Sequence, residues 1–259
     1  MTVLNDPEVP TAGHSIYEIG GLQRTLASVF ANSWTKTPLI HVGAKINVAK
    51  AEAFRLSHGE RFGCRISMTV FIQKCVALAA RDYPLLSGII DGDGDSVERV
   101  IVPAPDEIAI TGPVMIGDTA MPITIEQASS KSLVAIAREM TATVADLRGR
   151  ELGIDDSLAG FQKLASIPNI GISNIGMMGK VDFFTAVCIT PSVAALYVPA
   201  TIMTPIVAED GTIVAAPCVN FCLAFDHRVL AAGPIAQFFD RFRDLMEHPE
   251  RHLVEFGEG

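Results

Sequence analysis

Two side chains in the C-terminal half of the chain have types suited to acid–base and oxyanion chemistry, and His227 is the first. It follows five apolar residues, 221–225, and stands between Asp226 and Arg228 where a buried strand should end. A strand end can hold an ionisable group rigidly at the rim of a cleft, and an imidazole titrates near neutral pH, so His227 is a candidate general base. A structural histidine with satisfied hydrogen bonds is the alternative that the residue types leave open.

The second candidate lies in residues 172–179, which read Ile-Ser-Asn-Ile-Gly-Met-Met-Gly. Ser173 and Asn174 place a hydroxyl and an amide in a Gly-rich segment, which we interpret as a turn that leaves polar groups accessible. A loop with an uninvolved serine is the alternative. The segment is not a G-x-S-x-G elbow, so the sequence does not support a covalent hydrolase serine.

The elements that must position these residues combine helical and strand patterns. Apolar residues at helical spacing predict four helices, over residues 22–32, 67–83, from Ser129 or Ser130 to 149, and 233–248. Strands are predicted over residues 39–48, 183–189, 193–198, 212–215 and 219–225. The acidic run 91–95 lacks the spacing of an EF-hand and is interpreted as a hairpin turn. No repeat or linker divides the chain, which predicts one α/β domain.

The composition excludes several classes of protein. Twenty Lys and Arg against 29 Asp and Glu give a net charge of −9, which opposes binding to nucleic acid or to anionic lipid. Five cysteines without paired or CxxC spacing predict neither a disulfide framework nor a metal site, and they favour a cytoplasmic location. No signal-peptide pattern opens the chain, and prolines interrupt its longest uncharged stretch, 183–208, so no membrane span is expected.

In this order, the two motifs resemble the catalytic domain of the dihydrolipoamide acyltransferases, the core subunits of 2-oxoacid dehydrogenase complexes, and through them chloramphenicol acetyltransferase. The matching stretches are residues 172–179, 183–186, Pro191, 194–195, 225–229 and 236–238. The resemblance runs from about residue 20 to residue 249. It implies an α/β fold, a chloramphenicol acetyltransferase-like mixed-sheet sandwich with flanking helices in a trimer. Residues 1–19 are then a leader and residues 20–259 the catalytic domain.

The resemblance also implies roles for particular residues. His227 would remove a proton from the attacking thiol or hydroxyl, and Ser173 would donate a hydrogen bond to the tetrahedral oxyanion. In the family, the histidine of one subunit faces the serine of its neighbour, so a homotrimer or a larger homo-oligomer is expected. Asn174, Met177 and Phe183 are expected to contact the substrate.

The chain departs from the family pattern after the histidine. Members usually continue His-Arg-Val-x-Asp-Gly, or with Asn in place of that Asp, but Ala231 stands at this position. The arginine that pairs with the acid in the wider family corresponds to Gln23 on a weak alignment. Loss of both partners of an ion pair can be nearly neutral, which favours a retuned, functioning site. A nearby backbone carbonyl could then fix the tautomer of His227.

The sequence contains no lipoyl attachment motif and no subunit-binding module, and this predicts a free-standing enzyme without a permanently bound cofactor. The expected reaction moves an acyl group, expected to be acetyl, from acyl-CoA, or from an acyl carrier protein, to a hydroxyl of a small metabolite, such as a polyketide tetronate intermediate. Two alternatives stay open. The chain could be a truncated dihydrolipoamide acyltransferase core that uses lipoyl groups of another chain, or a catalytically silent trimeric scaffold, which the absent acid at Ala231 suggests.

Overall fold

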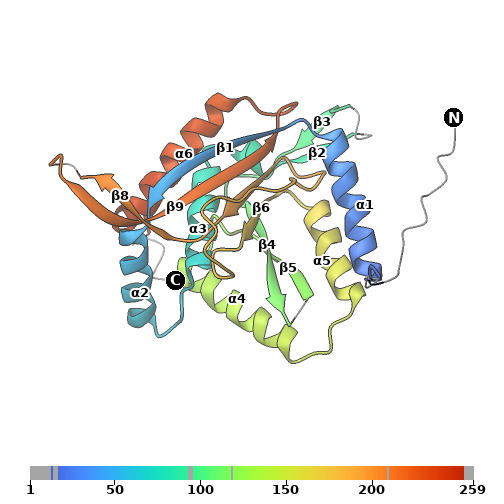
Figure 1. The fold of residues 1–259 in the computed structure, drawn as a ribbon, viewed down its shortest axis with the longest axis horizontal. Helices are drawn as coiled ribbons and strands as arrows, with labels where there is room; N and C mark the ends of the chain where they lie inside the picture. Colours follow the sequence, from blue (N-terminus) through green and yellow to red (C-terminus); the bar gives the residue numbers. More distant parts are fainter. Residues whose placement is uncertain (1–12, 14–16, 93–95, 118, 209, 254–259) are drawn as a thin grey trace, which may run out of the picture.

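A computed structural model describes residues 13, 17–92, 96–117, 119–208 and 210–253. They form a mixed seven-stranded sheet with helices on both faces, and a separate two-stranded hairpin of β2 (Ile89–Asp91) and β3 (Arg99–Ile101) (Figure 1). The α/β architecture predicted from the sequence is confirmed, as is a hairpin around the acidic run, of which residues 93–95 lie outside the described part. No helix of the described segments is long and apolar enough to cross a bilayer.

The strand order of the sheet determines where the two candidate residues lie. The order is β1–β9–β7–β6–β4–β5, and β8 extends the sheet by pairing with the outer part of β9. β6 runs parallel to β4 and β7, whereas β7 runs antiparallel to β9. The C-terminal ends of β6 and β9 therefore point to opposite ends of the strands, with β7 between them. The strands are β1 (Leu39–Asn47), β4 (Ala109–Ile116), β5 (Thr119–Ile125), β6 (Asn169–Asn174), β7 (Ala194–Val198), β8 (Ile202–Val207) and β9 (Ile213–Asp226).

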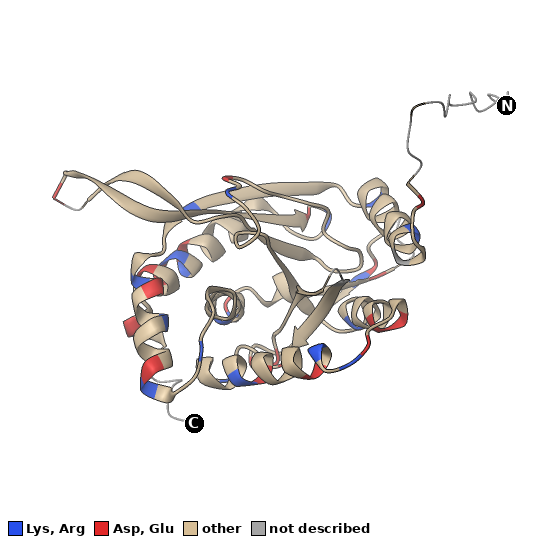
Figure 2. Ribbon diagram, turned by 60° about the horizontal axis from the view of Figure 1, so that its bottom comes forward, with Lys and Arg blue, Asp and Glu red and all other residues tan. Residues whose placement is uncertain are grey.

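One face of the sheet carries the main core. Helices α3 (Met68–Ala80), α4 (Leu133–Arg148) and α6 (Ala232–Glu247) cover it, and α2 (Ala49–Phe62) packs against α3 and α6. Alternate residues of β9 point into this core, where the rings of Phe221 and Phe242 meet edge to face at 5.0 Å. Charged residues occur mainly along the helices, and few occur on the strands (Figure 2).

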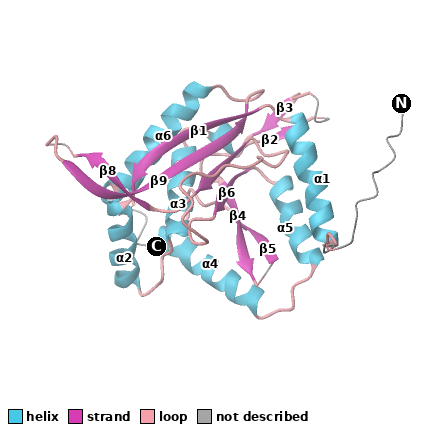
Figure 3. Cartoon of the chain, viewed as in Figure 1, coloured by secondary structure: helices cyan, strands magenta, loops and turns pink. Residues whose placement is uncertain are grey.

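The other face is covered less completely. Helices α1 (Gly21–Lys36) and α5 (Ile154–Ser166) lie beside β4 to β6, and the long segment 175–193 crosses the centre of the sheet without regular structure (Figure 3). The ring of Phe184 in this segment packs edge to face on Tyr197 of β7 at 5.2 Å. A small second cluster of Cys188, Tyr197, Cys222 and Ala224 is buried beneath it.

Most of the predicted elements are present. The helices predicted over residues 22–32, 67–83 and 233–248 are α1, α3 and α6, and the side chain of Ser67 caps α3 by accepting from Val70 N at 3.2 Å. The strands predicted over residues 39–48 and 193–198 are β1 and β7.

Four details of the prediction were wrong. The cap of α4 is Ser132, which accepts from Ala135 N at 3.1 Å, whereas Ser130 bonds within the preceding turn. Residues 183–189 are not a strand, because both edges of β7 are already paired by β6 and β9. Residues 212–225 are not two strands, because β9 continues through Pro217. Ser173 and Asn174 end strand β6 and do not lie in a turn.

Candidate active site

His227 lies on a tight turn that directly follows β9. The turn is anchored at its start, because Asp226 N donates to Val193 O at 2.9 Å and His227 N donates to Pro38 O at 3.1 Å. It closes through a bond of 3.1 Å from Leu230 N to Asp226 O. The backbone around His227 is therefore held by two other segments of the chain and by a bond within the turn itself.

The ring of His227 is oriented by a backbone carbonyl. Nδ1 lies 2.8 Å from Leu230 O, and because a carbonyl only accepts, Nδ1 carries the proton in this bond. In the neutral imidazole, Nε2 is then unprotonated and available as a base. The side chain is exposed, and no partner of Nε2 lies among the described residues. The carbonyl suggested by the sequence as a substitute for the missing acid is confirmed.

Asp226 and Arg228 brace the same turn, a role that the sequence did not reveal. The Asp226 side chain is fully buried, and its Oδ1 accepts from the Arg228 backbone N at 2.9 Å. The Arg228 guanidinium binds both carboxylate oxygens, with NH2 at 2.6 Å from Oδ2 and Nε at 3.0 Å from Oδ1. Such a forked ion pair fixes geometry as well as charge. The only signal in the sequence was the pair of opposite charges flanking His227 at the end of an apolar run.

Ser173 faces an apolar groove on the incompletely covered side of the sheet. Successive side chains of β6 point to opposite faces of the sheet. Ile172 lies in the main core, and Ser173 is half-buried on the other face. The groove has a volume of about 280 Å³. Among the described residues, no hydrogen-bond partner for the Ser173 hydroxyl is present, so it is available to a bound ligand. The groove is walled by α1, α5, β4 to β7 and residues 186–192, with Leu26, Phe30, Phe161 and Val187 among its side chains.

Asn174 holds the turn that follows Ser173. Its Oδ1 accepts from Gly176 N at 2.9 Å, and its Nδ2 donates to Thr69 Oγ1 at 3.0 Å near the start of α3. A Cβ on Gly176 would lie 2.5 Å from Pro199 O, so only glycine fits where the turn passes this strand end. In the structure, Asn174 positions the turn that follows Ser173. Its direct contact with substrate stays a prediction.

The other predicted substrate contacts lie on the surface. Met177 is 87% exposed in the turn after β6, and Phe183 is 57% exposed in the segment that crosses the sheet. Neither lines the groove at Ser173. Their contact with substrate therefore stays a prediction, as does that of Ser173 and His227.

Ser173 and His227 do not meet within one chain. Ser173 pairs with Tyr197 across β6 and β7, and Tyr197 pairs with Cys222 across β7 and β9. His227 lies five residues beyond Cys222, so the two residues are separated by about 17 Å along the strand and about 10 Å across it. A single protomer cannot bring both to one reacting carbon.

Ala231 and Gln23, the positions at which the sequence analysis expects the family ion pair to be missing, do not line the groove at Ser173 or bond to His227. Ala231 is the N-cap of α6 and offers no side-chain cap. Gln23 is exposed on α1. No buried charge is left unpaired at either position, which agrees with loss of both partners together.

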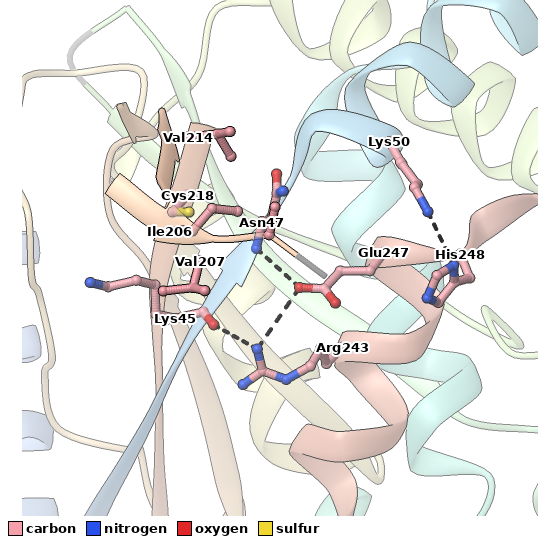
Figure 4. A pocket seen from close by; sticks show the side chains of 11 residues that line it. Lys45, Asn47, Lys50, Ile206, Val207, Val214, Cys218, Arg243, Glu247 and His248 are labelled. Atoms are coloured by element: carbon pink, nitrogen blue, oxygen red, sulfur yellow. Dashed lines mark hydrogen bonds and ion pairs between the residues drawn. The ribbon is translucent and has the colours of Figure 1, made fainter. Parts of the chain in front are cut away.

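A larger cavity lies elsewhere. It has a volume of about 490 Å³ and is found at the base of the β8–β9 hairpin, where Lys50, Arg243 and Glu247 line it (Figure 4). It contains neither Ser173 nor His227, and it lies at the opposite end of β9 from His227. We therefore assign the candidate active site to the His227 turn and the groove at Ser173.

Comparison with known proteins identifies the family. The model of the 2-oxoacid dehydrogenases acyltransferase (catalytic domain) matches residues 12–254. The chain belongs to this family. It is 26% identical over 240 residues to the lipoamide acyltransferase component of the branched-chain alpha-keto acid dehydrogenase complex of Bacillus subtilis, a match that covers 91% of this chain and 53% of that protein. The chain thus spans about half the length of the curated relatives it matches.

Solved structures confirm the predicted fold class. The dihydrolipoamide acetyltransferase of Azotobacter vinelandii superposes with a TM-score of 0.79 at 23% identity, covering 97% of this chain and 100% of the other. That structure addressed the role of a serine, a histidine and an asparagine in its catalytic mechanism. A chloramphenicol acetyltransferase gives a TM-score of 0.55 at 13% identity, covering 90% of this chain and 99% of the other. The chain is therefore an acyltransferase-family domain with a chloramphenicol acetyltransferase-like fold.

Proposed function

We propose that this acyltransferase moves an acyl group from a thioester to an acceptor at sites shared between protomers of a homotrimer. His227 of one protomer takes the proton from the acceptor through Nε2, and the acceptor attacks the thioester carbonyl carbon. Ser173 of the neighbouring protomer donates a hydrogen bond to the oxyanion, and the thiolate leaves with the proton that His227 returns. The observation that carries the proposal is the bond from His227 Nδ1 to Leu230 O, which leaves Nε2 as the base.

The shared site follows from distances within the chain. The two residues lie toward opposite ends of the strands of one sheet. Nε2 of His227 and the hydroxyl of Ser173 have no hydrogen-bond partner among the described residues, so both atoms are available to a ligand. In a cyclic assembly, one surface of each protomer contacts a different surface of its neighbour, so residues that are far apart in one chain can meet at the interface. The proposal therefore requires an assembly, and a trimer is the smallest that the family resemblance implies.

A dihydrolipoamide thiol is the first candidate acceptor. The curated relatives are lipoamide acyltransferase and dihydrolipoyllysine-residue acetyltransferase components of 2-oxoacid dehydrogenase complexes. They favour this alternative over the small-metabolite hydroxyl expected first from the sequence. Coenzyme A is then the thiol on the other side of the exchange.

A hydroxyl of an apolar small molecule is the second candidate. Two observations favour it, namely the groove at Ser173, whose described lining carries no charged side chain, and Ala231, which removes the polar residue usual in the family. An apolar groove fits an uncharged, hydrophobic acceptor. A polyketide tetronate acceptor and an acyl carrier protein as donor stay predictions.

The acceptor can be decided by chromatography of the reaction products. The protein is incubated with acetyl-CoA and either dihydrolipoamide or a panel of primary alcohols, and free CoA and the acylated acceptor are quantified. Equal amounts of CoA and S-acetyl-dihydrolipoamide support the first candidate. Turnover of alcohols alone supports the second, and no CoA release with any acceptor supports the silent-scaffold alternative and overturns the proposal.

A further inference from the structure

A second polar cavity lies where α3 ends and α7 (Pro249–His252) packs beside α6. Its volume is about 400 Å³. Arginines from three elements line it: Arg81 at the end of α3, Arg241 of α6 and Arg251 of α7. None of these residues belongs to the groove at Ser173 or to the turn of His227.

Arg241 forms the fixed part of this cavity. Its Nε lies 3.5 Å from Asp82 Oδ2, and its NH1 donates to Asp244 Oδ2 at 3.3 Å. The same Asp244 oxygen lies 2.7 Å from Nε2 of His252, which also lines the cavity. Because two carboxylates and an imidazole surround it, the guanidinium has a defined position before any ligand binds.

Arg81 and Arg251 differ from Arg241 because their side chains are exposed and make no ion pair or hydrogen bond with the described residues. Three guanidinium groups therefore line the cavity against one carboxylate, that of Asp82. With His252 counted as neutral, the lining carries a formal charge of +2, or +1 when the Asp244 carboxylate that pairs with Arg241 is included, within a chain whose net charge is −9. A local concentration of positive charge in an acidic protein attracts anions to that one place.

We propose that this arginine cavity binds a small organic phosphate. A guanidinium presents donors in a planar fork that matches phosphate oxygens, and a phosphate monoester carries about 1.5 to 2 negative charges at pH 7. The negative charge of the phosphate is opposite in sign to the net positive charge of the lining. The volume falls in the range of small-molecule pockets and exceeds the space that an inorganic ion fills, so room is left for the organic part.

The arginine cavity is separate from the candidate active site. Helix α3 begins beside Asn174, through Thr69, and ends beside Arg81. Arg81 follows Thr69 by twelve positions, which correspond to about 18 Å of helix. Binding in the arginine cavity can therefore be tested independently of acyl transfer, and its failure would leave the proposed function unaffected.

Isothermal titration calorimetry of the full chain tests the proposal, with adenosine 5′-monophosphate, inorganic phosphate and glutarate as probes. We expect the nucleotide to bind with a Kd below about 1 mM and more tightly than inorganic phosphate or glutarate. Arg81→Ala and Arg251→Ala should each weaken nucleotide binding about tenfold or more. Lys50→Ala, which removes one positive charge from the lining of the other cavity, is the matched control and should leave binding unchanged.

Three results would overturn the proposal. The first is no saturable heat with the nucleotide. The second is an affinity that neither arginine substitution changes, which would place any binding elsewhere. The third is equal affinity for glutarate or inorganic phosphate, which would show a general anion site. Circular dichroism of both variants, whose substituted side chains are exposed, verifies that they are folded.

Discussion

The turn of His227 and the groove at Ser173 are held in different ways. The His227 turn is fixed by backbone bonds to Pro38 and Val193, by the buried Asp226–Arg228 pair and by the carbonyl that orients the ring. The Ser173 hydroxyl instead opens into an apolar groove, and no partner for it is present among the described residues. The groups that hold the His227 turn all lie within the chain. The Ser173 hydroxyl can obtain a hydrogen-bond partner from a ligand or from a neighbouring protomer.

This difference indicates which of the two side chains has to be oriented before substrate binds. In the proposed role of general base, His227 must present one nitrogen at one angle, and the bond to Leu230 O orients its imidazole before substrate binds. An oxyanion donor is a hydroxyl that rotates freely and can adapt once the thioester is in place. Substitutions in the two regions should therefore differ in how much they affect rate, substrate binding and stability.

The largest effect is expected from His227→Ala. Loss of the general base should lower kcat by about 10²–10⁴-fold, with little change in unfolding free energy because the side chain is exposed. Steady-state kinetics of acyl transfer measures this. His248→Gln, a change at a half-buried histidine at the end of α6, serves as the control. A His227→Ala enzyme with unaltered kcat would show that another group is the base.

Ser173→Ala should have the next largest effect. Removal of one oxyanion donor should lower kcat by about 10²–10³-fold and leave KM nearly unchanged, because the hydrogen bond strengthens in the transition state. The matched control is Ser166→Ala, an exposed hydroxyl at the end of α5. A rise in KM at constant kcat would instead assign Ser173 to substrate binding.

Arg228→Ala tests the bracing of the His227 turn through stability. It leaves the fully buried Asp226 carboxylate without its guanidinium, which should cost about 3 kcal/mol of unfolding free energy. Urea unfolding measures this cost, and kcat should fall as well because the turn is no longer fixed. Exposed Arg150→Ala, which breaks a surface pair with Asp146, should cost less than about 1 kcal/mol. Equal costs for the two variants would contradict the bracing role.

The smallest effect concerns α3, which supports the Ser173 side through Thr69. On this helix, burial lowers the pKa of Lys74 to about 8, although its Nζ donates to three backbone carbonyls. The unfolded chain binds more protons than the folded chain between this pKa and the ordinary lysine pKa of 10.5. The stability of wild type relative to Lys74→Met should therefore rise by about 2 kcal/mol as pH increases through this window. A flat or falling difference in urea titrations would contradict the lowered pKa.

Local patterns in the sequence selected the two candidate residues, whose roles stay predictions. The apolar run before His227 predicted that it ends a buried strand, and glycines after Ser173 indicated an accessible hydroxyl. The family motifs added the roles, and the family and the fold class are confirmed. The strand end before His227 and the accessibility of Ser173 depend on residues a few positions away in the sequence. Periodic patterns of apolar residues predict structure over this short range.

Features formed between distant segments were not predicted. Helices α2 and α5 went unrecognised, so the groove wall that Phe161 provides opposite Phe30 was missed. Residues 183–189 have strand-like composition but cover the sheet, because both edges of β7 are occupied. The Asp226–Arg228 pair is close in sequence, yet its importance arises from the burial of Asp226, which depends on the whole fold.

Complementation between two inactive variants tests the shared site most directly. His227→Ala and Ser173→Ala chains are co-expressed in equal amounts with different tags, the mixed oligomers are purified, and acyl transfer per protomer is measured. If each site takes His227 from one protomer and Ser173 from the next, about one third of the sites in the purified mixed trimers are intact, because a trimer with two chains of one variant and one of the other has one site that contains both residues. We predict activity close to that fraction of wild type. Mixed oligomers no more active than the two separate variants would contradict the account.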